Sequence, residues 1–364
     1  MNTIILNQSQ KEKTQACPII IGNNLVGKIN TLFDLSVFSR IVVVTDTNTE
    51  RLFLKTLLCA LPKSAARVVL PTGEKEKNFK NVQKILIAMH KAYCDRDTLV
   101  INLGGGVVSD IGGFAASIFM RGVSILNIPT TLLAQADASI GGKTGINFLG
   151  IKNLVGTFAQ PIGVVIDVTT LRSLPGRELI SGFAEIIKHG LVANRTLFHL
   201  ATCKTPRDFT NNKLIAIITK SCRVKADIVS CDHTEQHERK LLNFGHTIGH
   251  AVEALSQTSV NPILHGEAVV IGMMVEAKIS ELSGLLSQTS CSVIEEALTS
   301  LPLPKLPEVI PIQNIMDVIR SDKKSKNGII QWTLLTEIGK GIINQVVCDN
   351  TVIAALKQTK GIIV

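Results

Sequence analysis

The sequence predicts an α/β domain with a parallel sheet, followed by a mainly α-helical domain. Short runs of Val, Ile and Leu alternate with helical stretches in the first half of the chain, whereas the second half carries helix-spaced apolar residues. The length of 364 residues suits two domains. We place the boundary between residues 1–171 and residues 172–364.

Five apolar runs predict the strands of the first domain. Each run is continuous rather than alternating, which is typical of strands buried on both faces, and the helical stretches between them favour right-handed parallel connections. The runs are Arg40–Asp46, Ala66–Pro71, Thr98–Leu103, Val123–Ile128 and Gly163–Val168.

Helical periodicity dominates after about residue 171. The predicted helices are Glu178–Ala193, Lys213–Val229, Gly245–Ser256, Gly266–Leu286 and Ser292–Ser300. Prolines punctuate Leu301–Pro311, which predicts a connector that no helix crosses. A final pair of apolar runs, Ile329–Leu335 and Gly341–Val347, predicts a hairpin.

Composition excludes some classes of protein but does not identify the ligand or binding partner. The formal charge of +9 fits a nucleic acid, a membrane surface or an acidic small substrate, but aromatic residues make up 4% of the chain, which argues against a single-strand nucleic-acid platform. Eight scattered cysteines with no CxxC pair indicate a reducing compartment. The most apolar window, Leu99–Met120, is broken by glycines and Asp110, so we expect no transmembrane span and a cytoplasmic protein.

A glycine triplet, Gly104–Gly106, follows a predicted strand and opens a helix. Such a turn lets a phosphate approach the backbone at the positive end of the helix dipole. The pattern G-x-G-x-x-G would need glycine where Ser109 stands, so a tight turn without a ligand is an equal alternative.

Polar residues at two other strand ends fit the same kind of site. Asp46 and Asn48 could hold ribose hydroxyl groups, although Asp and Asn are also common in ordinary turns. Thr130 and Thr131 form a hydroxyl-rich turn, for which helix N-capping is the alternative.

The glycine-rich stretch of residues 135–153 is the densest candidate for substrate binding. It carries Asp137, Lys143, Lys152 and Asn153, and we interpret it as a loop whose backbone N–H groups and lysines bind an anion. A solvated surface loop is the alternative.

Histidines and a buried carboxylate predict a metal centre. His246 and His250 stand at i and i+4 on one helical face, and His265 follows. Glu185 and Lys188 form a charged pair in an otherwise apolar helix, which is costly unless they are paired or bind a ligand. Two His and one Glu leave a zinc position open for substrate, the pattern of a catalytic site. The segment Asp232–His237 is also rich in His, but its flanking charges favour a solvated turn.

At these positions the chain resembles the 3-dehydroquinate synthase family of sugar phosphate cyclases. The resemblance runs through nearly the whole chain, in ordered blocks. They are GGGVVSD (104–110), MRG (120–122), IPTTLLAQADASIGGKTGIN (128–147), KNLVGTF (152–158), AEIIKHG (184–190), LLNFGHTIGHAVE (241–253), LHGEAV (264–269) and DKKSKNG (322–328).

The resemblance implies a Rossmann-like NAD-binding domain, a metal-binding helical domain, bound NAD, zinc or cobalt, and a homodimer. The implied metal ligands are Glu185, His246 and His265. The implied cofactor contacts are Asp46, Asn48, Glu74, Lys77, Gly105, Gly106, Asp110, Thr130, Thr131, Ser173 and Leu174, with Lys143 and Lys152 shared with the substrate. The implied substrate and catalytic residues are Asp137, Lys143, Lys152, Asn153, Lys188, Lys225, Arg239, Asn243, His250 and Lys324, and Arg121 is implied to reach the partner subunit's site.

The implied reaction converts 3-deoxy-D-arabino-heptulosonate 7-phosphate into 3-dehydroquinate and phosphate, with NAD regenerated in each turnover. Four positions depart from the family pattern, namely Ser109, Phe148, His233 and His237. Three other functions stay open. They are a related NAD- and metal-dependent dehydrogenase, a different sugar phosphate cyclase, and a non-catalytic protein that binds anions or nucleic acid. Lys225 and Arg239 argue against the second and the metal set against the third.

Overall fold

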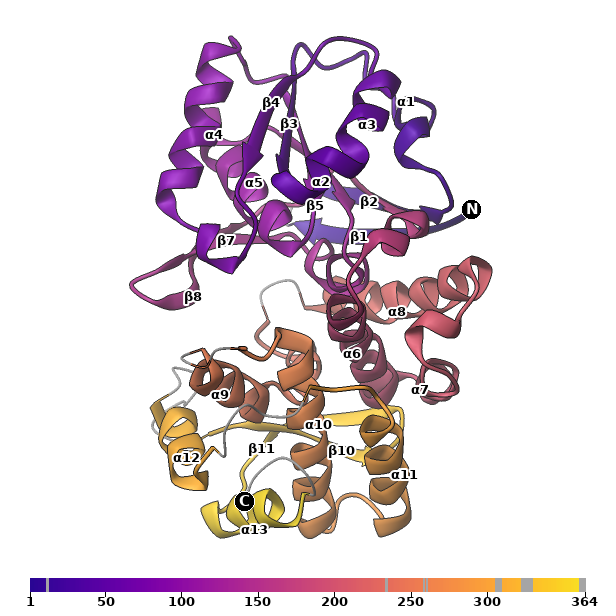
Figure 1. The fold of residues 1–364 in the computed structure, drawn as a ribbon, viewed down its shortest axis with the longest axis vertical. Coiled ribbons are helices and arrows are strands. Elements are labelled where there is room, and N and C mark those ends of the chain that lie inside the picture. The colour runs from indigo at the N-terminus through magenta and orange to yellow at the C-terminus, as the bar shows by residue number, and fades with distance from the viewer. Residues whose placement is uncertain are drawn as a thin grey trace. The chain divides into compact units, whose positions relative to one another are not determined.

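The computed structural model of the chain describes residues 1–10, 13–232, 235–257, 259, 261–304, 310–321 and 330–359. The chain divides into two compact units. Unit 1 is Met1–Leu174 with Thr210–Ser230, and unit 2 is Pro175–Phe209 with Cys231–Val364 (Figure 1). Helix α8 (Asn211–Cys231) from the middle of the chain is therefore part of unit 1 almost throughout its length. The boundary that we predict after residue 171 separates an expected NAD-binding part from an expected metal-binding part, and it stays a prediction.

Unit 1 is built on a seven-stranded sheet with the order β1-β2-β9-β6-β5-β3-β4. The strands are β1 (Asn2–Gln10), β2 (Lys13–Gly22), β3 (Ile41–Asp46), β4 (Ala66–Leu70), β5 (Leu99–Gly104), β6 (Ser124–Pro129) and β9 (Gly163–Asp167). All neighbours pair in parallel except β1 and β2. The structure confirms the five predicted strands, each within one residue at either end. It adds the edge hairpin β1–β2, which we did not predict and in which Ile4 and Leu6 are buried while Ile5 is exposed.

Alternate residues of the central strands supply two separate cores. Val42 and Val44 of β3 face a core that contains residues of α4 (Phe79–Lys91) and α5 (Gly106–Ile118). Val43 faces the other core, with residues of α1 (Ile29–Leu32) and α3 (Lys55–Ala60). Because side chains alternate along a strand, a strand that is apolar throughout requires helices on both faces of the sheet. The short helix α2 (Thr47–Thr49) follows β3 directly.

The stretch of residues 135–153 is not the loop that we predicted. It begins within a single π-helical turn, Ala134–Ala138, and continues as an antiparallel hairpin of β7 (Lys143–Phe148) and β8 (Ile151–Phe158). Gly145 is required for close packing of the two strands, since a Cβ atom there would lie 2.7 Å from the carbonyl oxygen of Val155. Gly150 has φ +76° and lies in the turn between the strands. The abundance of glycine concealed a strand pair from the sequence pattern.

Unit 2 is mainly helical, as predicted. Its helices are α6 (Gly176–Ala193), α7 (Arg195–Thr202), α9 (His246–Ser256), α10 (His265–Leu282), α11 (Gln288–Thr299), α12 (Ile312–Ser321) and α13 (Asp349–Gln358). Helix α10 is buried along most of its length and packs against α6, α9, α11 and α13. The predicted C-terminal hairpin is present as β10 (Trp332–Glu337) and β11 (Lys340–Gln345).

Helix α10 ends earlier than the apolar periodicity predicts. Gly284 has φ +72°, and the N–H of Leu285 donates to the carbonyl of Ser280 at 2.9 Å, which is a left-handed glycine termination. In the connector, residues 301–304 and 310–311 form no helix or strand, and residues 305–309 lie outside the described part of the chain. Among helices of the described residues, none combines the length and apolar character needed to cross a bilayer.

Asp167 at the end of β9 holds the turn that follows β2, and its replacement should destabilise unit 1. Its carboxylate accepts hydrogen bonds from the backbone N–H groups of Asn24 (2.9 Å), Leu25 (2.6 Å) and Val26 (3.1 Å). Because a neutral amide keeps only one acceptor oxygen, we expect Asp167→Asn to lower the free energy of unfolding by about 2 kcal/mol in urea titration. Asp97→Asn on the exposed surface is the control and should change it by less than about 0.5 kcal/mol. Equal stability of both variants would contradict the assignment.

Candidate functional site

The nucleotide-site residues of unit 1 lie where the strand order reverses. Strand β3 pairs with β4 on one side and with β5 on the other, so the chain changes direction along the sheet between these strands. Open α/β sheets bind ligands at the carboxyl ends of strands at such a point. Asp46 ends β3 and Gly104 ends β5, and the structure thus brings the two strand-end motifs to one edge of the sheet.

The strand-end side chains also perform ordinary capping roles. Asp46 caps α2 by accepting from the N–H groups of Asn48 (2.9 Å) and Thr49 (3.0 Å). The Thr131 hydroxyl accepts from the N–H of Ala134 at 3.2 Å, and the Thr130 N–H donates to the Gly104 carbonyl at 2.9 Å. These residues therefore take part in caps and turns, as the alternative interpretation predicted. The same turns also lie at the point where the strand order reverses.

The glycine turn cannot easily accept larger residues. Gly105 is the N-cap of α5 and Gly106 is its first residue. A Cβ atom at Gly105 would lie 3.0 Å from Cγ2 of Thr131, and one at Gly104 would lie 2.5 Å from Cγ2 of Val108. Ser109, one of the departures from the family pattern, is buried, and its hydroxyl donates to the Gly105 carbonyl at 3.3 Å. The serine therefore fits within the first turn of α5.

The buried Lys77 brings together three other predicted residues of unit 1. The Lys77 ammonium lies 2.6 Å from the Asp110 carboxylate and 3.7 Å from that of Glu74, and it donates to Oδ1 of Asn153. Asn147 adds a further link because its amide nitrogen lies 2.9 Å from Glu74 Oε1 and its side-chain oxygen accepts from the Asn153 N–H at 3.0 Å. Burial raises the pKa of Asp110, although the Lys77 charge acts in the opposite direction. The network ties the β7–β8 hairpin to the helix that follows the glycine turn.

Asp137 and Lys225 form the second polar group of unit 1. The Lys225 ammonium lies 2.5 Å from Oδ1 of Asp137 and donates to the Asp137 carbonyl at 2.6 Å. Lys225 is buried on α8, so a helix from the middle of the chain contributes a side chain to this group. Lys143 and Lys152 are exposed on β7 and β8, and Ser173 ends a 3-10 turn next to Leu174.

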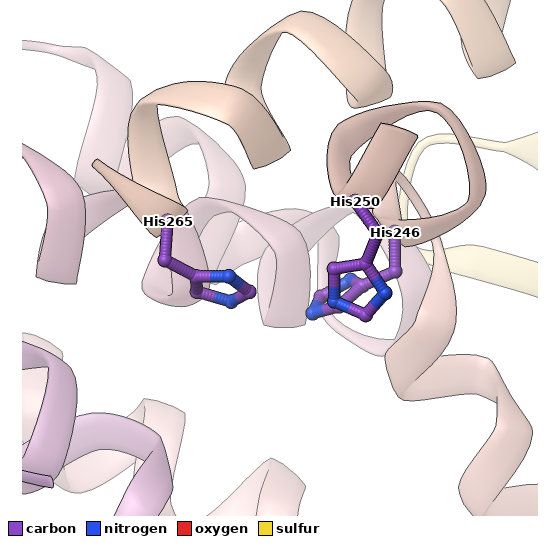
Figure 2. Close-up of side chains that lie close together, drawn as sticks. All are labelled: His246, His250 and His265. Carbon is purple, nitrogen blue, oxygen red and sulfur yellow. The ribbon is translucent and has the colours of Figure 1, made fainter. Parts of the chain in front are cut away.

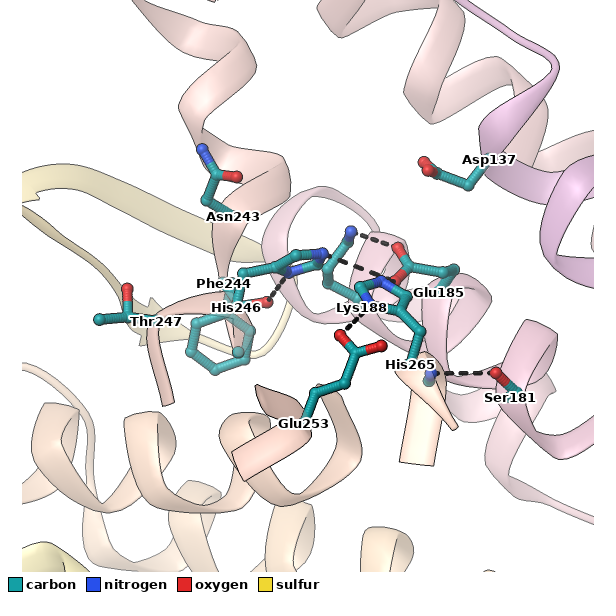
Figure 3. A network of polar contacts seen from close by, with 12 residues as sticks. Asp137, Ser181, Glu185, Lys188, Asn243, Phe244, His246, Thr247, Glu253 and His265 are labelled. Atoms are coloured by element: carbon teal, nitrogen blue, oxygen red, sulfur yellow. Dashed lines mark hydrogen bonds and ion pairs between the residues drawn. The ribbon is translucent and has the colours of Figure 1, made fainter. Parts of the chain in front are cut away.

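The predicted metal ligands of unit 2 converge from three helices (Figure 3). Glu185 lies on α6, His246 is the first residue of α9, and His265 is the first residue of α10. The Nε2 atoms of His246 and His265 lie 3.8 Å and 3.6 Å from Oε1 of Glu185. The Glu185 side chain is 1% exposed, so the two imidazoles approach a buried carboxylate.

His250 stands beside the other two imidazoles (Figure 2). Its ring centroid lies 5.0 Å from that of His246 and 5.7 Å from that of His265. One nitrogen from each of the three rings lies within 4.8 Å of the others, a grouping able to hold a metal ion. The i, i+4 spacing thus correctly predicted a shared face for His246 and His250.

The second nitrogen of each ligand imidazole has its own acceptor. Nδ1 of His265 lies 3.2 Å from Oε2 of Glu253, and Nδ1 of His246 lies 3.2 Å from the Phe244 carbonyl. Acceptors at Nδ1 favour the tautomer whose Nε2 lone pair is available to a metal. Glu253 is missing from our sequence prediction. It is a charged residue in an apolar helix, the same signal that identified Glu185.

Burial and the neighbouring groups shift the pKa values of the two histidine ligands in opposite directions. Burial and the nearby Lys188 ammonium lower the pKa of His246 well below its usual value, which keeps a lone pair available. Burial acts to lower the pKa of His265, but hydrogen bonds to Glu185 and Glu253 and their charges outweigh it and raise this pKa to about 9. Lys188 is itself buried and pairs with Oε2 of Glu185. The anionic surroundings of His265 also favour a divalent cation.

The segment that carries His265 is clamped to α6. The Gly266 N–H donates to the Ser181 hydroxyl at 2.9 Å, and a Cβ atom at Gly266 would lie 1.9 Å from the Ser181 carbonyl oxygen. Arg177 binds the buried Glu267 carboxylate through two contacts of 2.8 Å and 2.7 Å. These contacts explain why His265 is followed by Gly and Glu in the sequence.

Two further predicted residues of unit 2, Arg239 and Asn243, lie on the approach to α9. Arg239 is buried, and its N–H donates to Asp232 at 3.1 Å, as does that of His237 at 2.7 Å. His237 is one of the positions that depart from the family pattern, and Asp232 still closes the turn that contains it. The amide of Asn243 donates to Glu235 at 2.9 Å. Lys324 and His233 lie outside the described residues.

Phe148, the last departure, contacts another aromatic side chain. It stands at the end of β7, and its ring packs edge-on against that of Phe79 at 5.7 Å.

The two groups of residues fit the cofactors that the sequence predicts. Imidazole nitrogens and a carboxylate oxygen are the donors that zinc uses in catalytic sites, and here they converge with acceptors at the outer nitrogens. The reversal point of a parallel sheet, with a glycine turn at a helix N-terminus, fits a dinucleotide.

Comparison with known proteins assigns the family. The 3-dehydroquinate synthase N-terminal model matches residues 67–181, and the 3-dehydroquinate synthase C-terminal model matches residues 182–325. A curated 3-dehydroquinate synthase of Acidithiobacillus ferrooxidans is 41% identical over 311 residues, which cover 83% of this chain and 84% of that protein.

Two solved structures share the whole fold. ValA, a 2-epi-5-epi-valiolone synthase from Streptomyces hygroscopicus subsp. jinggangensis 5008 with NAD+ and Zn2+ bound, is 26% identical with a TM-score of 0.86, over 97% of this chain and 99% of that chain. A 2-deoxy-scyllo-inosose synthase complexed with carbaglucose-6-phosphate, NAD+ and Co2+ has a TM-score of 0.86 at 22% identity, over 98% of this chain and 100% of that chain, a likeness of fold.

The architecture and the two residue groups define an enzyme with the fold of the sugar phosphate cyclases. The predicted fold class is thus confirmed. Within this class, the chain belongs to the 3-dehydroquinate synthase family, whose members are phosphate-eliminating lyases.

Replacement of His265 should abolish tight metal binding while the fold is kept. The imidazole is partly exposed and sits at the first position of α10, so its removal leaves the helix contacts in place. We expect His265→Ala to lose bound zinc, measured by elemental analysis after dialysis, with an unchanged far-UV circular dichroism spectrum. Zinc content equal to that of the parent protein would remove His265 from the ligand set.

Glu253 should control metal affinity through His265. We expect Glu253→Ala to weaken zinc binding by about 10–100-fold in competition with a chromophoric chelator, because it removes the acceptor at Nδ1. Glu253→Gln is the matched variant, since its carbonyl oxygen can still accept the same hydrogen bond, and it should retain most of the affinity. If the alanine variant binds zinc as tightly as the parent protein, the acceptor has no such role.

Proposed function

We propose that the chain converts 3-deoxy-D-arabino-heptulosonate 7-phosphate into 3-dehydroquinate and phosphate with catalytic NAD and a divalent metal, zinc or cobalt. Membership of the 3-dehydroquinate synthase family supports this activity, since the curated relative is 41% identical over 83% of the chain. The observation that carries it is the convergence of Glu185, His246 and His265 from three helices. The product belongs to the shikimate pathway of aromatic amino acid biosynthesis.

NAD would be held by unit 1 at the reversal point of its sheet. Asp46 and Asn48 would bind ribose hydroxyl groups, and the N–H groups of the Gly105–Gly106 turn would bind the phosphates. The proposed remaining contacts are Glu74, Lys77, Asp110, Thr130, Thr131, Lys143, Lys152, Ser173 and Leu174. When bound, NAD supplies a reversible hydride acceptor for one substrate carbon.

The metal would be held by Glu185, His246 and His265. When bound, it supplies a Lewis acid that favours deprotonation of a coordinated substrate hydroxyl. Lys188 donates a charge-assisted hydrogen bond to Glu185 and thereby orients the carboxylate. Asp137, Lys188, Asn243 and His250 would orient the substrate hydroxyl groups and move protons to and from them.

Two cationic groups would bind the acidic ends of the substrate. Lys143, Lys152, Asn153, Lys324 and Arg121 of a second subunit would hold the phosphate. Lys225 and Arg239 would hold the carboxylate, for which the planar guanidinium suits a two-point contact. Both Lys225 and Arg239 are buried in the described structure, as expected of residues that bind charge rather than solvent.

A homodimer in the cytoplasm is part of this proposal. Exposed apolar side chains gather on β7–β8 and near Arg121, and they include Met120, Phe148, Leu149 and Phe158. The Ser117 and Thr157 hydroxyl groups lie 2.6 Å apart, so the turn that carries Arg121 lies beside the end of β8. Large exposed apolar groups are typical of protein interfaces. We also keep residues 1–171 as the NAD-binding domain and residues 172–364 as the metal-binding domain of the proposal.

The reaction can be followed by two readouts in one vessel. Purified protein with zinc, trace NAD and the heptulosonate phosphate should release phosphate many times in excess of NAD, while absorbance at the NADH wavelength stays flat. The expectation follows from hydride removal and return within one turnover. NADH that rises in step with turnover would instead indicate a dehydrogenase, and no release of phosphate would contradict the proposal.

A further inference from the structure

Glu276 is a buried carboxylate of unit 2 that lies outside the predicted active-site residues. It stands in the middle of α10 and is 0% exposed. Its Oε2 accepts from the Gly245 N–H at 2.6 Å, and its Oε1 accepts from the N–H groups of Thr247 at 3.0 Å and Ile248 at 3.2 Å. A single side chain of α10 thus binds the start of α9.

These N–H groups belong to the end of α9 that carries a metal ligand. The first N–H groups of a helix have no acceptor within the helix, and the helix dipole makes this end positive. Glu276 supplies both the missing acceptors and the opposite charge. Because His246 is the first residue of α9, the carboxylate holds the backbone on both sides of this ligand.

The two helices also meet at a distance that only glycine permits. A Cβ atom at Gly272 would lie 1.8 Å from the Gly245 carbonyl oxygen, and one at Gly249 would lie 3.0 Å from the Ala268 carbonyl oxygen. Gly245 has φ +79°, a conformation that glycine adopts without strain. Helix α10 begins at His265, so this contact and Glu276 together set His246 relative to the other histidine ligand.

We propose that Glu276 is a positioning residue of the metal centre, which fixes His246 through the backbone of α9. The inference rests on the proposed metal-dependent function. Both carboxylate oxygens are needed, since an amide would turn an NH2 group toward one set of N–H donors. The residue acts on metal affinity and on ligand geometry, and it touches neither metal nor substrate.

The test compares Glu276→Gln with the parent protein under conditions where both are folded. We expect zinc affinity, measured by chelator competition, to fall by about 10–100-fold, the effect typical of groups that orient metal ligands. The absorption spectrum of the cobalt-substituted protein should also change, because a displaced imidazole alters the ligand field. A residue with only a structural role would change neither measurement.

Asp167→Asn is the matched control. Asp167 is likewise a buried carboxylate that accepts from backbone N–H groups, but it lies in unit 1. It should lose stability and keep the parent zinc affinity and cobalt spectrum. Parent-like zinc affinity and cobalt spectrum in Glu276→Gln would overturn the inference.

Glu276→Asp carries the test if the glutamine variant does not fold. This variant keeps the charge, but its shorter side chain moves the carboxylate away from the N–H groups of α9. We therefore expect its zinc affinity to fall below that of the parent protein. Parent-like affinity in this variant would overturn the inference. If the parent protein itself bound no zinc or cobalt, the proposed metal centre would fail first, and the role of Glu276 would fail with it.

Discussion

The arrangement of α6, α9 and α10 depends on the burial of the negative charge of Glu185. The Glu185 carboxylate sits in an apolar helix at 1% exposure, where an uncompensated charge would strongly destabilise the fold. Lys188 pairs with one oxygen, and two imidazoles approach the other. Three helices must hold their positions for this compensation to occur, and the tight glycine contacts of Gly266 with α6 and Gly272 with α9 make those positions attainable.

A similar arrangement organises unit 1. The Lys77 ammonium is buried, and the carboxylates of Glu74 and Asp110 lie around it together with the Asn153 amide. This cluster links the turn after β4, the helix after β5 and the β7–β8 hairpin. In both units the polar groups expected to bind ligands also hold distant segments together, so substitutions at these sites should affect stability as well as binding.

The sequence predicts those features whose signal is local. Continuous apolar runs identified β3 to β6 and β9, and charges in apolar helices identified Glu185 and Lys188. Features that depend on distant partners escaped prediction. Glu276 accepts a hydrogen bond from Gly245, which is 31 residues away in the sequence. Arg177 binds Glu267, which is 90 residues away. The β7–β8 hairpin escaped because its glycines, required for close backbone packing, mimic a loop. Nothing in the periodicity of α8 shows which unit it joins.

The position of α8 has a consequence for how the protein is made. A nascent chain emerges N-terminus first, and domains generally fold as units during synthesis. Unit 1 is still incomplete when residue 174 has been synthesised, because α8 is missing. In the folded unit, Asn211 and Thr219 of α8 contact Asn23 and Asn2, respectively. Lys225 of α8 contacts Asp137. Residues 175–209 of unit 2 must leave the ribosome before this helix does. Asn2, Asn23 and Asp137 therefore acquire these contacts only after a segment has emerged that is translated more than a hundred residues after the first strands.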